Sequence, residues 1–305
     1  MPIHAFGYLL VVILLFAGNL LVGKLATDSL PPLTLALGRM LVAFLAVLAC
    51  FGHAAWRQRH HLREQVKALA VMAVTGMALF NATLYSALQT SEAANVAVLE
   101  SLIPAVTALM MALFFRERLG GIKWLGILLS ALGASWVVTQ GEPWVILQRL
   151  QIGDAYVGGA IASWVLYSLA ARQWLGRVPF YASLVPMTGM AVLFLLPLAV
   201  LENILSDVSW QLDGGAIGAM LYLGLGPSLV ALLCYNRALL LVGPSRTATS
   251  LNLLPVATMA LGYGVLGLPV SIHQLTGAFM VIVGVSMVTL NFRRRHTLYQ
   301  GNDAL

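Results

Sequence analysis

Long apolar runs separated by short polar connections make up most of this sequence. Each run approaches the roughly 20 residues that a helix needs to cross the hydrocarbon core of a bilayer. None shows the alternation of apolar and polar residues that is typical of barrel strands, and a helix bonds its backbone polar groups internally, as lipid requires. The pattern predicts an all-α polytopic membrane protein with ten transmembrane helices, over residues 5–25, 33–51, 66–88, 93–115, 122–138, 155–173, 180–201, 216–241, 244–266 and 272–292.

Composition excludes other classes. Of 305 residues, 60% are hydrophobic and 9% are charged, which is too few charges to cover the surface of a soluble domain. The net charge of +6 does not indicate a nucleic-acid partner, because the basic residues lie in small groups between apolar runs. Cys50 and Cys234 lie inside apolar runs, so we expect no disulfide, metal site or cofactor.

The basic residues predict the orientation in the membrane. With both termini in the cytoplasm, fourteen Lys and Arg fall in cytoplasmic segments and two, Lys24 and Arg149, fall outside. Positive charge in short loops is retained in the cytoplasm. We therefore expect a multi-pass protein of the bacterial inner membrane with cytoplasmic N- and C-termini.

The two halves of the chain resemble each other when one is shifted by 151 residues. The shift places Pro104 on Pro255 and Gly126 on Gly277, and Gly133 falls on Gly284. Since each half holds five helices, an odd number, the second half enters the membrane from the opposite side, as in inverted-repeat transporters. The sequence predicts repeats at 1–145 and 150–295 around a central cavity, followed by a cytoplasmic tail at 296–305.

Short motifs in a fixed order resemble a known family. They are the segment from Phe16 to Asn19, the segment from Pro31 to Arg39, Leu102-Ile-Pro104, the segment from Phe115 to Leu119, and Gly153-Asp154. Together they are similar to EamA-type members of the drug/metabolite transporter superfamily. The resemblance implies two five-helix bundles around a cavity and efflux of small metabolites, such as amino acids, or of toxic compounds. The chain departs from the family pattern at Leu268, opposite Glu117, which favours a structural role for Glu117.

Polar residues at one depth indicate where the cavity lies. Arg39 and Glu100 stand about six and seven residues below the outer ends of their spans, or roughly 9 and 11 Å at 1.5 Å per residue. Asn19, Asn81 and Tyr85 fall in the same outer half. Glu100 is a candidate for binding an amine or carrying a proton, or is a fixed partner of Arg39; Arg39 is a structural anchor or a site for a substrate carboxylate.

Further candidates come from later spans. Trp164 and Tyr167 lie near the midplane, where their rings either line the cavity and stack on a substrate or pack against helices. Asn252 offers an orienting or interhelical hydrogen bond. Pro104 and Pro255 each remove a backbone bond and bend a helix, as hinges or as static kinks. Gly158 with Ala162, and Gly214 with Gly218, predict close helix packing.

These features predict a secondary transporter that exports small metabolites by alternating access, with proton antiport as one form of coupling. An uncoupled facilitator, a multidrug or organic-cation carrier and a channel are the alternatives. A lipid-modifying membrane enzyme lacks sequence support, because no H-E-x-x-H, G-x-S-x-G or Walker-type motif occurs. The partners that we expect are a small-molecule substrate, membrane lipid and protons, in a monomer or homodimer.

Overall fold

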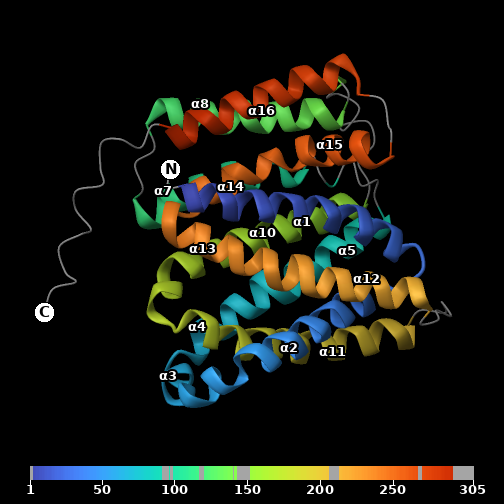
Figure 1. Cartoon of the computed structure of the whole chain (residues 1–305), viewed down its shortest axis with the longest axis vertical. Helices are drawn as coiled ribbons and strands as arrows, with labels where there is room; N and C mark the ends of the chain where they lie inside the picture. The colour runs from blue at the N-terminus through green and yellow to red at the C-terminus, as the bar shows by residue number, and fades with distance from the viewer. Residues whose placement is uncertain are drawn as a thin grey trace, which may run out of the picture.

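The computed structural model describes residues 3–90, 96, 99–116, 120–139, 141–142, 152–205, 213–266 and 270–290. The described part of the chain is helical, without strands (Figure 1). Its helices are α1 (Ile3–Thr27), α2 (Pro32–Arg57), α3 (Arg59–Glu64), α4 (Val66–Ala73), η1 (Val74–Leu79), α5 (Phe80–Thr90), α7 (Ile103–Phe115), α8 (Gly121–Val138), α10 (Ile152–Trp174), η2 (Leu175–Arg177), α11 (Phe180–Leu205), α12 (Gly214–Leu225), η3 (Gly226–Ala231), α13 (Leu232–Val242), α14 (Pro244–Ser250), η4 (Leu251–Leu253), α15 (Leu254–Leu266) and α16 (Ile272–Leu290).

The ten predicted spans correspond to ten helical stretches in the described part of the chain, although residues 93–95 and 97–98 of the predicted fourth span lie outside the described residues. The third is α4–η1–α5, the eighth is α12–η3–α13 and the ninth is α14–η4–α15, while the others are single helices. By length and hydropathy, five helices qualify as membrane spans: His4–Thr27, Pro32–Arg57, Val66–Thr90, Phe180–Leu205 and Gly214–Val242. The predicted tail at 296–305, Glu117 and Leu268 lie outside the described residues.

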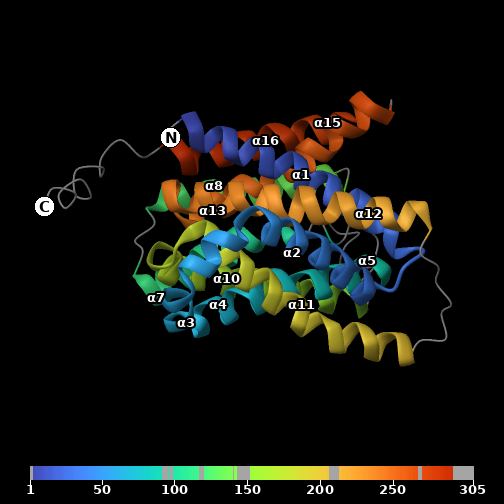
Figure 2. The ribbon, with the colours of Figure 1, turned by 60° about the horizontal axis from the view of Figure 1, so that its bottom comes forward.

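Helices of one half pack against helices of the other. Figure 1 shows α8 beside α16, the fifth and tenth spans, at one end of the molecule, and α2 beside α11, the second and seventh spans, at the other. The first span packs on the eighth through α1 and α13, and the sixth packs on the third through α10 and α5. Figure 2 shows α1 running along α12 and α13. The two halves therefore share one interleaved bundle.

Glycines at the crossing of α8 and α16 show that the halves are inverted. A Cβ on Gly126 would lie 2.7 Å from the carbonyl oxygen of Gly284, and one on Gly133 would lie 2.8 Å from that of Gly277. Residue numbers rise along one helix as they fall along the other, so the helices are antiparallel. The 151-residue shift turns the contact of Gly126 with Gly284 into that of Gly277 with Gly133. A two-fold axis that relates the halves requires this reciprocity. The exact limits of the repeats, 1–145 and 150–295, stay a prediction.

The predicted glycine packing surfaces were wrong. A Cβ on Gly158, Gly214 or Gly218 would meet no heavy atom within 4 Å. The spacing alone does not say which face of a helix meets a neighbour, and these small residues lie on open faces. The close approaches use the glycines of α8 and α16, and Gly224, where a Cβ would lie 2.7 Å from the Arg39 carbonyl oxygen.

The helices are irregular near the middle of the spans. A π-helical segment interrupts the third span at η1 and the eighth at η3. Pro104 and Pro255 are each the second residue of a helix, α7 or α15. The first turn is the position in a helix that tolerates proline best. Their role as hinges stays a prediction.

The carboxylate of Glu202 joins the end of α11 to the start of α2. Its oxygens accept the backbone N–H groups of Leu33, at 3.1 Å, and Thr34, at 3.0 Å. These groups belong to the first turn, which has no intrahelical acceptors and attracts negative charge. We expect Glu202→Ala to lower the free energy of unfolding by about 1–2 kcal/mol, measured by thermal unfolding in detergent. Glu202→Gln keeps one acceptor oxygen, so a loss as large as that of the alanine variant would contradict the cap.

Candidate substrate-binding cavity

A cavity of about 400 Å³ lies between the two halves, within the size range of small-molecule sites. Six of the eight residues predicted to bind substrate line it: Asn19, Arg39, Asn81, Glu100, Trp164 and Asn252. The other two, Tyr85 and Tyr167, are fully buried behind the wall. Of the two prolines, only Pro255 belongs to the lining. The described irregular segments η1, η3 and η4 all contribute wall residues.

Arg39 is held by neutral groups from three other spans. Its Nε donates to Ser228 Oγ at 2.8 Å, and its Nη1 donates to Asn19 Oδ1 at 2.8 Å and to the Tyr85 hydroxyl. The Tyr85 hydroxyl in turn donates to Asn19 Oδ1 at 3.0 Å. Only 3% of Arg39 is exposed. The planar fork of a guanidinium suits several fixed acceptors at once, so this network holds spans one, two, three and eight in register.

The π-helical segments place their side chains at this network. Ser228 belongs to η3, where its hydroxyl donates to the Leu223 carbonyl and accepts from Arg39. Gly76 belongs to η1, and its lack of a side chain leaves room for the Tyr167 ring, which packs directly on it. π-Helical turns are often found at functional sites because they redirect side chains. Sequence reasoning missed Ser228, for which the adjacent Pro227 in an apolar span was an available signal.

Glu100 lines the cavity as a half-buried carboxyl with no hydrogen bond or ion pair to a described residue. The ion pairs in the described part of the chain are Lys24 with Asp28 and His61 with Glu64. The interpretation of Glu100 as a fixed partner of Arg39 therefore has no support in the structure. Arg39 and Glu100 line the same cavity but do not contact each other.

An aromatic cluster forms the floor. The ring centroid of Trp164 lies 6.0 Å from that of Phe16, 4.6 Å from Phe80 and 5.0 Å from Tyr235. Its indole N–H donates to the Tyr235 hydroxyl at 3.2 Å, which satisfies the polar group of a buried tryptophan. Tyr167 donates to Asn236 Oδ1 just beneath. Sequence reasoning found Trp164 but not the phenylalanines that complete the apolar surface.

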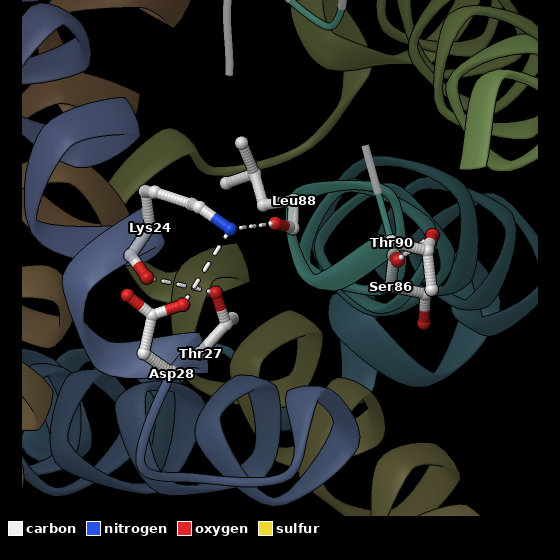
Figure 3. Close-up of polar contacts among 6 residues, drawn as sticks. All are labelled: Lys24, Thr27, Asp28, Ser86, Leu88 and Thr90. Carbon is white, nitrogen blue, oxygen red and sulfur yellow. Dashed lines mark hydrogen bonds and ion pairs between the residues drawn. The ribbon is translucent and has the colours of Figure 1, made fainter. Parts of the chain in front are cut away.

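Lys24 stands at the predicted outer end of the cavity. Its Nζ donates to the Leu88 carbonyl near the end of α5 at 2.9 Å and pairs with Asp28 at 3.5 Å (Figure 3). A lysine at a helix C-terminus satisfies carbonyls that have no intrahelical donor. The contact ties span one to span three. Lys24 entered the sequence interpretation only as a topology signal, since nothing local shows which helix end it meets.

Asn252, in the second half, forms a hydrogen bond to Ser130, in the first half. Its Nδ2 donates to Ser130 Oγ on α8 at 2.8 Å, and that hydroxyl donates to the Ile127 carbonyl at 2.9 Å. Interhelical hydrogen bonds of this kind have modest value in membranes. The lining role predicted for Asn252 is compatible with this position, and one N–H of its amide is used by Ser130.

The fold and the cavity together define a polytopic membrane protein built from two inverted halves around a cavity. The chain belongs to the EamA-like transporter family, whose model matches residues 5–139 and 151–290. It is 27% identical to the uncharacterized transporter YyaM of Bacillus subtilis, over 75% of this chain and 74% of that protein. It is 28% identical to the uncharacterized inner membrane transporter YicL of Salmonella typhimurium, over 76% of each. A crystal structure with 20% identity and a TM-score of 0.72, covering 96% of this chain and 98% of that one, shares the fold. The protein is therefore a multi-pass transporter of this family.

Proposed function

We propose that the protein is a secondary transporter that exports small amphipathic metabolites, amino acids or related compounds, across the bacterial inner membrane by alternating access. The observation that carries this proposal is a cavity between inverted halves with polar and apolar walls. Inverted repeats commonly expose a midplane site to each side in turn by rocking. The family and its relatives point to transport rather than to chemical change of a substrate.

The lining residues favour an outward-facing state. Under the predicted topology, Lys24 and Val137 lie at the outer ends of spans one and five, and Gln274 lies at the outer end of span ten. Beneath them, the bonds from Trp164 to Tyr235 and from Tyr167 to Asn236 join α10 to α13 and close the floor. These hydrogen bonds would have to break for the cavity to open to the cytoplasm.

Glu100 is the proposed proton carrier, because it is the acidic residue among the described residues that line the cavity. A carboxyl inside a span is costly to keep charged and exchanges protons as its access to water changes. Flux requires no ATP in this scheme. An uncoupled facilitator would use the same cavity without this exchange.

Reconstituted vesicles loaded with a mixture of labelled amino acids test the proposal. We expect efflux without ATP that accelerates when the receiving side is made acidic. Glu100→Gln is expected to abolish the response to the pH gradient, while substrate exchange at equal pH continues when the labelled substrate is saturating. Indifference of the parent protein to the gradient would remove proton coupling and leave a facilitator. Efflux of organic cations alone would favour the multidrug alternative, and chemically altered lipid after incubation would favour an enzyme.

A further inference from the structure

The hydrogen-bonding capacity of Arg39 is only partly used. A guanidinium carries five N–H groups, and three of those of Arg39 donate to Ser228, Asn19 and Tyr85. The two on Nη2 have no hydrogen bond to a described residue. In the described part of the chain, the side-chain polar atoms that are both fully buried and without a partner are Thr107 Oγ1 and Asn236 Nδ2. Arg39 Nη2 is not one of them, so it retains some exposed surface. Since Arg39 lines the cavity, Nη2 is the part that a ligand can reach.

Asn19 extends this donor group. Its Oδ1 accepts from both Arg39 and Tyr85, which fixes the orientation of the amide and leaves Nδ2 as the free end. No described residue accepts a hydrogen bond from Nδ2, and Asn19 also lines the cavity. Arg39 Nη2 and Asn19 Nδ2 therefore offer adjacent donors, one of them charged, which is a suitable environment for a carboxylate.

A separate acceptor group comes from spans three and four. Glu100 has no described partner, and Asn81 uses its Nδ2 to donate to the Met77 carbonyl at 2.6 Å, which leaves Oδ1 for a ligand. In the second half, the 151-residue shift places Leu251 opposite Glu100 and Leu232 opposite Asn81, and both leucines line the same cavity. Among the described residues that line the cavity, the carboxylate is therefore present in the first repeat alone.

The second repeat contributes a mostly apolar wall, and several of its polar groups are bonded within the protein. Ser228 bonds to Arg39 and Leu223, Asn252 donates to Ser130, and the Trp164 indole donates to Tyr235. Gln274 Oε1 accepts the backbone N–H of Ser271 at 3.0 Å. What remains exposed to the cavity from this repeat is mostly hydrocarbon, from Leu232, Leu251, Leu254, Met259 and Val270.

We propose that the cavity recognises a small zwitterion with an apolar body, in one orientation. The carboxylate binds Arg39 Nη2 and Asn19, the ammonium binds Glu100, and the body lies against the second repeat. This inference rests on the proposed transport function and specifies the ligand of the same site. Arg39 and Glu100 line one cavity without pairing. A ligand that bears both charges satisfies both side chains, whereas a ligand with one charge leaves a desolvated partner unpaired.

Three compounds of nearly the same shape test the two contacts separately. L-Leucine carries both charges, 3-methylbutylamine lacks the carboxylate, and 4-methylpentanoate lacks the ammonium. Binding is measured by titrated thermal shift of the full-length protein in detergent and by displacement of labelled leucine. We expect leucine to bind at least about tenfold more tightly than either analogue, because each analogue leaves one charged group without a partner.

Variants assign each contact. Glu100→Gln is expected to weaken leucine at least about tenfold and to leave 4-methylpentanoate nearly unchanged. The matched control is Glu64→Gln, since Glu64 is an exposed acid on α3 away from the cavity and its loss should not alter binding. The unfolding temperature without ligand shows whether each variant is folded.

Equal or tighter binding of 3-methylbutylamine would overturn the carboxylate contact and indicate a cation site. If vesicles export other members of the labelled amino-acid pool while leucine neither binds nor moves, the proposed orientation and class are wrong but transport stands. If nothing in the pool moves and no compound binds, both this inference and the amino-acid export proposal fail.

Discussion

Gly133→Leu is expected to prevent assembly of the two halves. A Cβ at this position would lie 2.8 Å from the Gly277 carbonyl oxygen and 2.8 Å from the Val281 backbone nitrogen, and backbone atoms cannot move aside as side chains do. Overpacking of this kind costs about 1–3 kcal/mol or more even where neighbours are flexible. We expect loss of the monodisperse peak in size-exclusion chromatography of detergent extracts, or a fall in unfolding temperature of about 2–12 °C.

Gly158→Leu is the matched control, because Gly158 is exposed on α10 and a Cβ there meets no heavy atom within 4 Å. This variant should elute and unfold like the parent. A Gly133→Leu protein with parental elution and unfolding temperature would show that α8 and α16 do not cross as closely as described, and the inverted arrangement would lose its main geometric support.

Arg39→Met is expected to reduce leucine exchange at low substrate concentration by about a hundredfold while the protein remains folded. A charge-assisted hydrogen bond to a ligand is worth about 1.5–3 kcal/mol, and about 1.4 kcal/mol corresponds to tenfold in affinity. Folding should survive because the partners of Arg39 still bond one another. The Tyr85 hydroxyl keeps Asn19 Oδ1 as its acceptor, and Ser228 keeps the Leu223 carbonyl.

Replacing a buried charge by an apolar residue of similar volume is often neutral for stability. Exchange in proteoliposomes and unfolding temperature in detergent are therefore measured on the same preparation. Arg39→Lys is the informative companion, since it keeps the charge but cannot reach Ser228 and Asn19 together. Parental exchange in Arg39→Met would exclude Arg39 from the ligand site. Loss of the folded protein would show that Arg39 is mainly a structural anchor.

Depth along the spans was enough to place several predicted residues at the cavity, and their role in binding stays a prediction. Polar and aromatic residues deep inside apolar spans, such as Arg39, Glu100 and Trp164, line the cavity, because lipid disfavours polar groups and turns them inward. Depth does not give rotation about the helix axis or the identity of the neighbour. For that reason Tyr85 and Tyr167 were assigned to the wall but lie behind it, and Ser228 and Phe80 were not found.

The sequence by itself determined the class and the number of helices, because a helix that bonds its polar backbone internally in lipid must be about as long as each apolar run. The matched positions of the two halves indicated their duplication. The tertiary structure decided which polar groups satisfy one another. It separated Arg39 from Glu100, bonded Arg39 to neutral partners and placed Glu202 at the start of α2. It also placed Gly133 against a neighbouring helix and Gly158 on an open face. These outcomes depend on distances between segments far apart in the chain, which no local pattern encodes.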